Sequence, residues 1–340
     1  MLHRMNFANF PHYRPVPEHV DIDIEKLRPD NSYDYLIQNR SHFLSMIQSH
    51  EGEVSPEKLE LVACPSCGSK LFNPITRKDG LCIVQCQHCS LIYVNPRVKE
   101  SEYEQLYAGG NYGHIVTKLA LASHLYRKDR FGSERLAILQ KYHNPDLSKT
   151  LLDLGSGSGF FIEKAREQGW DSYGIELSPP AVNFSRQRGN KVYDQILLNL
   201  SLPSESVSAV TMFDVLEHLP NPREHLVEVS RILPNGGILF IYVPNWNSAS
   251  RLLLGDSAHF IWPTHHLTYF TPETLETFVA SNGFSIEYLA TEGLDIVDWI
   301  WQQKKIGANV DLVAANIDTL QFLVNAGGWG KNLRMVARKI

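Results

Sequence analysis

The sequence predicts an α/β protein, in which an open and mostly parallel sheet is covered by helices on both faces and preceded by a small cysteine-bearing module. From residue 150 onward, apolar runs of strand length alternate with helical patterns, and a glycine-rich turn follows the first run. All five cysteines fall between Cys64 and Cys89. We therefore expect an N-terminal extension over residues 1–60, the cysteine module over 61–100 and the α/β domain over 101–340.

Composition places limits on the class of protein. The chain has 340 residues, 43% of them hydrophobic, and a formal net charge of −5, which allows one large and one smaller domain. No apolar run approaches the ~20 residues that a membrane span requires, and residues 1–13 lack the apolar core of a secretory signal. We expect a cytoplasmic protein without a membrane anchor, and the charge argues against a general affinity for nucleic acid.

The cysteines form two pairs with the spacing Cys-x-x-Cys, namely Cys64 with Cys67 and Cys86 with Cys89. Two such pairs supply four thiolates for a tetrahedral zinc ion, and short apolar runs between the pairs predict the strands of a zinc ribbon. A closed four-sulfur site has no open position, so we expect the zinc to be structural. The alternative is four buried thiols without metal. Cys82 lies outside the pattern and is expected to be a small apolar strand residue.

The N-terminal extension carries no chemical motif. Its start is interrupted by Pro11, Pro15 and Pro17, and a helix is predicted over 32–50. We expect this helix to pack on a neighbouring part of the chain or to contribute to an oligomer contact, such as that of a homodimer.

The elements of the α/β domain are bounded by glycine and proline. The predicted strands are 150–154, 172–176, 191–197, 207–212, 238–243, 284–289 and 333–338. The predicted helices cover 115–141, 160–168, 179–189, 222–234 and 272–283. A Trp-bearing helical insertion is expected over 294–325. The last strand follows it without an ordinary crossover helix and so can enter the sheet antiparallel.

The turn after the first strand predicts a nucleoside-binding site. Dinucleotide sites have the pattern G-x-G-x-x-G. Here the glycines stand at 155, 157 and 159, so the third comes one position early. No G-K-[ST] follows, which argues against a phosphate-binding loop for nucleotide triphosphates. Glu176 ends the second strand, where a carboxylate can accept both ribose hydroxyls. Asp153 can anchor a cationic amino group. A ligand with a ribose and an amino group, but without a phosphate, is S-adenosylmethionine.

These motifs together resemble the class I S-adenosylmethionine-dependent methyltransferases. The resemblance rests on Asp153-Leu-Gly-Ser-Gly-Ser-Gly159, on Glu176, and on Phe213-Asp-Val-Leu-Glu-His-Leu-Pro-Asn-Pro222. The nearest branch includes the ubiquinone-pathway O-methyltransferases and many sugar and natural-product methyltransferases. His266-Leu-Thr-Tyr-Phe-Thr-Pro272 is similar to its closing motif, and the cysteine pairs are similar to the N-terminal ribbon of its zinc-ribbon members. Residues 1–60 match no motif.

The resemblance implies a fold and a set of cofactor residues. The expected strand order is 3-2-1-4-5-7-6, with strand seven antiparallel. Gly155 and Gly157 are expected near the methionine portion, Glu176 at the ribose, Leu197 at the adenine and Phe213 beside the cofactor. The residues assigned to the cofactor are Asp153, Gly155, Ser156, Gly157, Gly159, Glu176, Leu177, Leu197, Phe213 and Tyr112.

Methyl transfer is an in-line displacement, which requires alignment and, for a hydroxyl acceptor, a base. The candidate bases are His266, His218 and His265. His266 is preferred because it begins the loop that should overhang the acceptor, whereas His218 can instead hold that loop through a backbone hydrogen bond. Asp214, Glu217 and His218 are spaced i, i+3, i+4. Related ubiquinone-pathway enzymes have a metal site at similar positions, so a divalent ion there could polarise a diol or enol acceptor; solvated or paired carboxylates are the alternative.

The predicted reaction is O-methylation of a small molecule, such as a sugar or another biosynthetic intermediate. The α/β domain has no Asn-Pro-Pro-Tyr and no cysteine, which argues against methylation of adenine amines and of cytosine C5. Trp246, Trp262 and the 294–325 insertion suggest a lid over the acceptor, and a packed helical hairpin is the alternative. Two other functions remain open: an RNA base methyltransferase that uses the ribbon to bind RNA, and a non-catalytic zinc-ribbon interaction protein.

Overall fold

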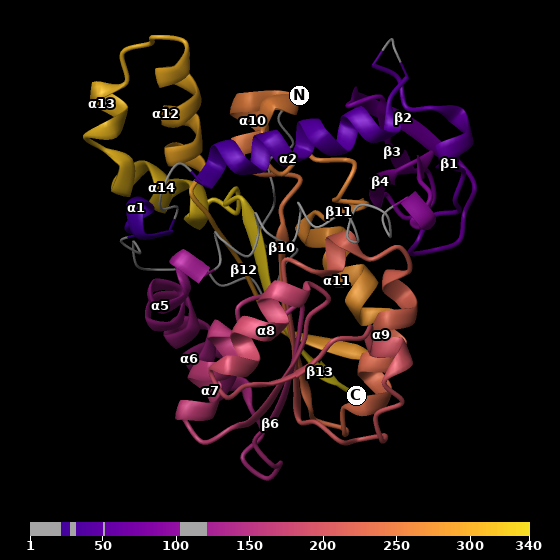
Figure 1. Ribbon diagram of the computed structural model, residues 1–340, viewed down its shortest axis with the longest axis vertical. Helices are drawn as coiled ribbons and strands as arrows, with labels where there is room; N and C mark the ends of the chain where they lie inside the picture. The colour runs from indigo at the N-terminus through magenta and orange to yellow at the C-terminus, as the bar shows by residue number, and fades with distance from the viewer. Residues whose placement is uncertain (1–21, 28–31, 50–51, 103–120) are drawn as a thin grey trace.

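The computed structural model describes residues 22–27, 32–49, 52–102 and 121–340 (Figure 1). Its centre is a seven-stranded sheet with the order β12-β13-β10-β9-β6-β7-β8. The strands are β6 Thr150–Leu154, β7 Asp171–Ile175, β8 Lys191–Tyr193, β9 Ala209–Phe213, β10 Ile238–Pro244, β12 Phe284–Glu292 and β13 Asn332–Lys339. Strands β6 to β10 pair in parallel, and β13 is antiparallel to both β10 and β12.

The predicted strand order and the antiparallel last strand are therefore confirmed. The third strand is shorter than expected, because β8 ends at Tyr193 and residues 197–199 form a 3-10 turn, η4 Leu197–Asn199. The fourth strand begins two residues later than predicted, at Ala209.

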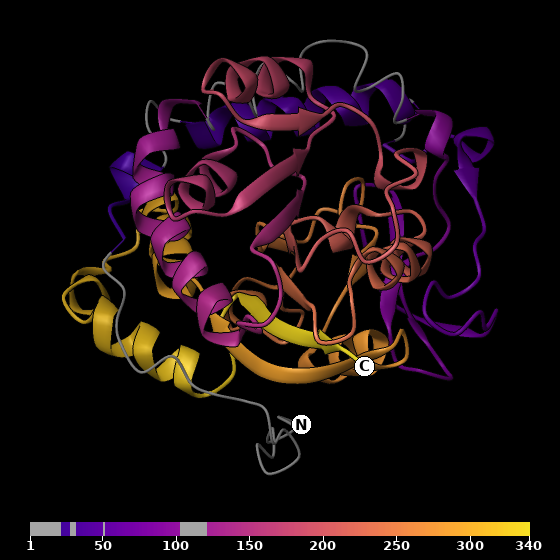
Figure 2. The ribbon, with the colours of Figure 1, turned by 90° about the horizontal axis from the view of Figure 1, so that it is seen from below.

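Helices cover both faces of the sheet (Figure 2). They are α6 Ser133–Tyr142, α7 Phe160–Glu167, α8 Pro179–Gln187, α9 Pro222–Ile232 and α11 Pro272–Ala280. Neighbouring residues of β6 point in opposite directions: Leu151 packs in the cluster with α6 and α7, and Leu152 in the cluster with α9 and α11. Burial on both faces explains why these strands are continuous apolar runs.

The sequence predicted one helical region over 115–141, and its described part consists of several shorter helical segments. It consists of α5 His124–Arg127, the π-helical turn η3 Lys128–Gly132 and α6. Residues 115–120 lie outside the described residues.

The ribbon is a second sheet, with the order β11-β4-β3-β2. Its strands are β2 Phe72–Lys78, β3 Leu81–Cys86, β4 Ile92–Val94 and β11 Thr268–Tyr269. Beside it, η2 Pro56–Lys58 leads into β1 Leu59–Glu60, which pairs with β5 Arg97–Val98. Strand β11 comes from the α/β part of the sequence, so the ribbon sheet is completed by a segment that lies far from it along the chain.

Helix α2 Ser32–Ile47 lies across the top of the molecule, between the ribbon and the C-terminal helices (Figure 1). Phe43 and Ile47 are fully buried in a cluster with ribbon strands β3 and β4. The predicted helix therefore packs on a neighbouring part of its own chain. The short α1 Ile24–Leu27 precedes it.

The predicted insertion over 294–325 forms three helices, α12 Asp295–Lys305, α13 Asp311–Ala314 and α14 Ile317–Ala326, and these pack near α10 Ala249–Leu254 and η6 Gly255–Ser257. The fully buried Asp295 fixes them to the rest of the protein. Its carboxylate accepts hydrogen bonds from the backbone N of Ser250 at 2.8 Å, from Gln321 Nε2 at 3.1 Å and from the backbone N of Lys331 at 2.9 Å. Among the described residues, no helix has both the length and the apolar character to cross a membrane.

Candidate functional site

The turn between β6 and α7 is built around three glycines in the left-handed region. Gly155, Gly157 and Gly159 have φ values of +68°, +54° and +77°, which other residues rarely adopt. A Cβ at Gly155 would lie 2.5 Å from Val215 Cγ2, and one at Gly159 would overlap the hydroxyl of Ser185. A Cβ at Gly157 would meet nothing within 4 Å. The turn is thus packed tightly at both ends and open in its middle.

The two serines between these glycines support the turn from the protein side. Both side chains are buried, and the backbone N of Ser156 donates to Ile175 O at 2.8 Å. Ser158 Oγ lies 2.9 Å from Nδ1 of His124, whose Nε2 lies 3.0 Å from the Glu163 carboxylate. Burial lowers the pKa of His124, so its ring is neutral and provides one donor and one acceptor. Ser156, a predicted cofactor residue, therefore stabilises the turn through its backbone.

Glu176 follows β7 and reaches across to the open middle of the turn. Its Oε2 accepts a hydrogen bond from the backbone N of Gly157 at 2.8 Å, and its Oε1 accepts one from the backbone N of Ser178 at 2.7 Å. Burial raises the pKa of this carboxyl group. Each carboxylate oxygen has a second lone pair, which leaves Glu176 able to accept hydroxyl groups of a ligand.

Asp153 lies at the end of β6 with only 3% of its surface exposed. Its Oδ1 accepts a hydrogen bond from Thr211 Oγ1 at 2.5 Å. Burial raises the pKa of Asp153 to about 7. A cationic group placed beside it would favour the charged carboxylate, which is the response that an ammonium anchor requires.

Arg135 is a site residue that the sequence did not reveal. This half-buried side chain on α6 places its guanidinium carbon 4.4 Å from the ring centroid of Phe213 and 4.8 Å from that of Tyr242. Among the described residues it forms no ion pair, and its charge acts to lower the pKa of both Asp153 and Asp214. A lone arginine in a helix carries no sequence signal, and only the packing of α6 against β9 and β10 brings it here.

The other predicted cofactor residues differ in their surroundings. Phe213 is 9% exposed and packs edge-on against Phe161 and Phe240. Leu177 is 54% exposed, whereas Leu197 is buried in the main core. Tyr112 lies outside the described residues.

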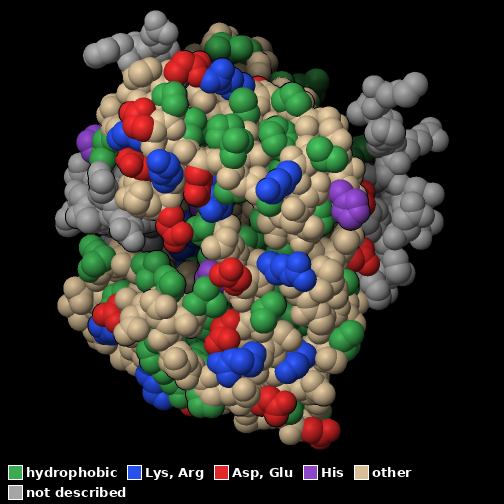
Figure 3. Space-filling model, turned by 90° about the vertical axis from the view of Figure 1, so that its right-hand side faces the viewer, with side chains coloured by type: hydrophobic (Ala, Val, Ile, Leu, Met, Phe, Trp, Pro, Cys, Tyr) green, Lys and Arg blue, Asp and Glu red, His purple; other side chains and the backbone are tan. Residues whose placement is uncertain are grey.

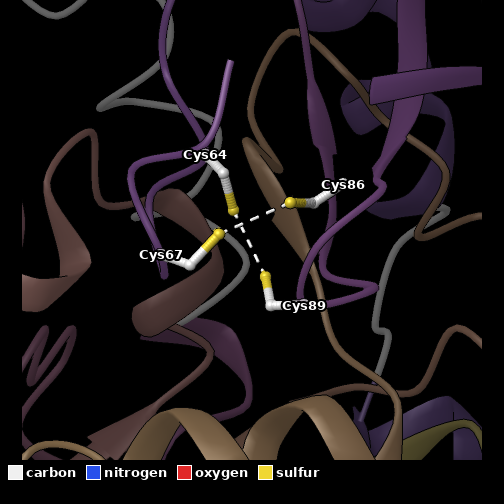
Figure 4. Close-up of side chains that lie close together, drawn as sticks. All are labelled: Cys64, Cys67, Cys86 and Cys89. Atoms are coloured by element: carbon white, nitrogen blue, oxygen red, sulfur yellow. Dashed lines mark hydrogen bonds between the residues drawn. The ribbon is translucent and has the colours of Figure 1, made fainter. Parts of the chain in front are cut away.

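The four cysteine sulfurs converge from the loop before β2 and from the turn between β3 and β4 (Figure 4). The Sγ atoms of Cys64 and Cys89 are 3.5 Å apart, as are those of Cys67 and Cys86, and all four lie within 4.8 Å of one another. A tetrahedral zinc with Zn–S bonds of about 2.3 Å would hold its sulfurs about 3.8 Å apart. The side chains therefore fit a four-sulfur zinc site. Cys82 lies on β3, outside this group.

The three candidate histidines lie close together at the end of η5 Leu216–His218 and in the loop before β11. His218 Nδ1 donates to the backbone O of His265 at 2.9 Å, and His266 Nδ1 donates to Phe260 O at 2.7 Å. Because a carbonyl only accepts, Nδ1 carries the proton in both rings, and Nε2 of each neutral ring presents a lone pair. Burial lowers the pKa of His218 to about 4 and that of His266 well below its usual value.

His265 differs from its neighbours. It is 3% exposed, its ring centroid lies 4.1 Å from that of Trp262, and its Nδ1 lies 2.9 Å from Thr264 Oγ1. Burial lowers its pKa to about 3. Its side chain supports the loop, and its carbonyl positions His218.

Glu217 completes a group of possible ligands with His218 and His266. One ligand atom from each of the three residues lies within 4.8 Å of the other two. Glu217 is 1% exposed, and neither of its carboxylate oxygens has a hydrogen-bond partner in the part of the chain that the structure describes. Burial raises its pKa well above the usual value. Two imidazole lone pairs and a carboxylate are a common donor set for divalent transition metals, and the backbone carbonyls behind both rings are typical of metal-binding histidines.

The sequence predicted a metal site formed by Asp214, Glu217 and His218, and the structure changes one member of that set. Asp214 has a φ of +56°, so the helical turn that would align it with the other two is absent, and only Leu216–His218 form a 3-10 turn. Asp214 therefore lies outside the group, and His266, from a distant loop, takes its place.

A cavity of about 780 Å³ adjoins this group. Arg135, Asp214, Glu217 and His266 contribute to its wall, together with Trp262 and residues of α12 to α14. It lies where the sequence predicted an acceptor pocket, between His266 and the 294–325 insertion.

Residues 124–289 match a family model described as a methyltransferase domain. This part of the chain is a methyltransferase domain. A "Ubiquinone biosynthesis O-methyltransferase" from Glaesserella parasuis is 26% identical over 200 residues, which are 54% of this chain and 85% of the relative. A protein of the same description from Dechloromonas aromatica is 31% identical over 121 residues, 33% of this chain and 52% of its own. The chain thus spans about half the length of some relatives and more of others.

Solved structures with a similar arrangement include a methyltransferase from Archaeoglobus fulgidus. It is described as "SAM dependent", is 20% identical, covers 62% of this chain and 94% of its own, and has a TM-score of 0.46. A putative methyltransferase in complex with the Haloferax volcanii Trm112 activator is 15% identical, covers 64% and 93%, and has the same TM-score of 0.46.

The raised pKa of Asp153 predicts a pH-dependent stability of the ligand-free methyltransferase. Between about pH 4 and 7 the unfolded chain releases this proton and the folded chain retains it, so the group's contribution to stability falls as pH rises. We expect the free energy of unfolding in urea to fall by about 3 kcal/mol more for the wild type than for Asp153→Asn between about pH 4.5 and 7.5. Asp146→Asn, at an exposed loop position, should behave like the wild type. Parallel curves for wild type and Asp153→Asn would contradict the prediction.

Proposed function

We propose that this methyltransferase transfers the methyl group of S-adenosylmethionine to a hydroxyl group of a small molecule. The observation that carries the proposal is the arrangement of two features at the edge of the sheet. The Glu176 carboxylate and the open backbone of Gly157 lie on one side. The cavity beside His266 and Glu217 lies on the other. This arrangement provides a nucleoside cradle next to a cavity for an acceptor.

On the cofactor side, four residues have complementary chemistry. Glu176 would accept the ribose hydroxyls, and the open face of Gly157 would allow the cofactor to approach the backbone. Arg135 has no ion-pair partner among the described residues and would bind the methionine carboxylate. Asp153 would face the ammonium group, directly or through water.

On the acceptor side, His266 offers the lone pair of Nε2 to a hydroxyl in the cavity. Its lowered pKa makes it a weak base, so it suits an acidic phenol or enol, or an alcohol acidified by another group. In the alternative arrangement a divalent ion is held by Glu217, His218 and His266 and occupies that lone pair, and the ion rather than the imidazole would lower the pKa of a coordinated hydroxyl. The unpartnered oxygens of Glu217 fit that ion. The relatives named for ubiquinone biosynthesis and O-methylation favour oxygen as the acceptor atom.

The RNA alternative receives little support from the ribbon. Of the five lysines and arginines in residues 61–100, Arg77 pairs with Glu53 and Arg97 pairs with Glu60. Lys78 and Lys99 donate to backbone carbonyls, which leaves Lys70 without such a contact among the described residues. Acidic and basic side chains are interspersed on the face viewed in Figure 3. A local basic patch, which RNA binding requires, is not formed by these residues. The cytoplasmic location and the homodimer remain predictions from the sequence.

Calorimetry with S-adenosylmethionine tests the cofactor assignment. Loss of the ribose contacts in Glu176→Ala should weaken binding by about 10- to 100-fold, since charge-assisted hydrogen bonds contribute about 1.5–3 kcal/mol. Glu224→Ala, which removes an exposed carboxylate from α9, should bind like the wild type. Equal affinity of Glu176→Ala and wild type would refute the assignment.

Elemental analysis tests the ribbon metal. We expect one tightly held zinc ion per chain in the wild type, and its loss in Cys89→Ser because three sulfurs cannot close the site. Cys82→Ser is the matched control, because this thiol lies outside the cluster, and should retain the zinc. A folded wild-type protein without metal would show that the four thiols are merely buried.

Titration with Mn²⁺ of protein that already holds its ribbon metal tests the second site. Glu217→Gln should weaken Mn²⁺ binding at least about tenfold, because it removes the only carboxylate of the group. Asp214→Asn should leave binding unchanged, since Asp214 lies outside the group. Loss of binding in Asp214→Asn alone would restore the metal set expected from the sequence.

A further inference from the structure

The segment 265–270, here called the strap, lies between the ribbon and the catalytic domain. On the ribbon side it includes β11, in which Thr268 pairs with Tyr93 and Tyr269 with Ile92. The backbone N of Val94 also donates to Leu267 O at 3.0 Å. The strap is therefore the edge strand that completes the ribbon sheet.

The opposite side of the strap is bonded to the acceptor residues. The backbone N of Leu267 donates to Glu217 O at 2.8 Å, and His265 O accepts the Nδ1 proton of His218 at 2.9 Å. One residue, Leu267, therefore bonds to the ribbon through its carbonyl and to the Glu217 backbone through its N–H. His266 is the residue immediately before it.

Side-chain packing joins the same parts. Ile83, Ile92 and Val94 of the ribbon are at most 3% exposed and share one apolar cluster with Phe260 and Tyr269. The carbonyl of Phe260 is the group that fixes the His266 ring at 2.7 Å. The residue after His266 is thus bonded to the ribbon, and the residue that holds the His266 ring packs in the cluster that includes the ribbon strands.

The cofactor residues are held differently. Asp153, Gly157 and Glu176 are at the ends of β6 and β7, and their hydrogen bonds are to Thr211, to Ser178 and to one another. None of these bonds involves the ribbon or the strap. The two halves of the site can therefore be disturbed separately.

We propose that the ribbon is a positioning element for the acceptor half of the site, acting through the β4–β11 pairing to fix His266 and Glu217. In this role the cysteine cluster maintains the geometry of a catalytic loop, and the ribbon need not bind nucleic acid or protein. The description of His266 as an acceptor residue rests on the proposed function, whereas the mechanical link rests on the contacts above.

The test is Val94→Pro, which removes the N–H that bonds to the strap and leaves all four cysteines in place. The matched control is Ile75→Pro, at the bulge of edge strand β2 on the opposite side of the same sheet. Ring ¹⁵N signals of histidine-labelled protein, assigned with His266→Gln, report the tautomer of His266. Calorimetry with S-adenosylhomocysteine reports the cofactor half, and elemental analysis reports ribbon integrity.

We expect Val94→Pro to keep its zinc and to bind S-adenosylhomocysteine within about twofold of the wild type, while the His266 signals shift from the Nδ1-protonated form towards an average of both tautomers. Ile75→Pro should leave these signals unchanged. If Val94→Pro does not fold, Ile92→Ala keeps the backbone bonds but loosens the shared cluster, and it should produce a smaller shift of the same kind. Unchanged His266 signals in a folded variant that breaks the pairing, or in Ile92→Ala, would overturn the inference. Failure of the wild type to bind S-adenosylhomocysteine would instead count against the proposed function.

Discussion

The site depends on the edge at which the parallel strands of the central sheet end. Strands buried on both faces carry mostly apolar side chains along their length, and groups that face a ligand lie where the strands end. Asp153 is the last but one residue of β6, Glu176 follows β7, and Asp214 and Glu217 follow β9. The parallel register brings these ends to one side of the sheet. The proposed cofactor cradle and the proposed acceptor cavity are neighbours because both are built from this edge.

Burial of ionisable groups at this edge determines their chemistry. Desolvation raises the pKa values of Asp153 and Glu217 and lowers those of His218 and His266, so carboxylates and imidazoles all move towards their neutral forms. Groups held in this way respond strongly to the arrival of a charge. A sulfonium cofactor with an ammonium group, or a divalent ion, would restore the charged carboxylates.

The ribbon is less independent than its sequence suggests. Its cysteines and first three strands lie within 64–94, but its fourth strand comes from 268–269. Its core merges with that of the catalytic domain, because Cys64, Cys86 and Tyr93 share a cluster with residues of α9 and α11. The ribbon and the methyltransferase domain are thus joined by a shared sheet and a shared core.

The sequence by itself determined the periodic and local features. Strand and helix order, the glycine turn, the Cys-x-x-Cys pairs and the carboxylates after strands are set by neighbouring residues, whose propensities and spacing act over a few positions. Tertiary structure decided which distant residues meet. Arg135 reaches the site by packing of α6, His266 replaces Asp214 because a left-handed residue breaks the expected turn, and β11 joins the ribbon through hydrogen bonds across more than 170 residues of chain. Such contacts depend on how elements pack in space, which local spacing does not encode.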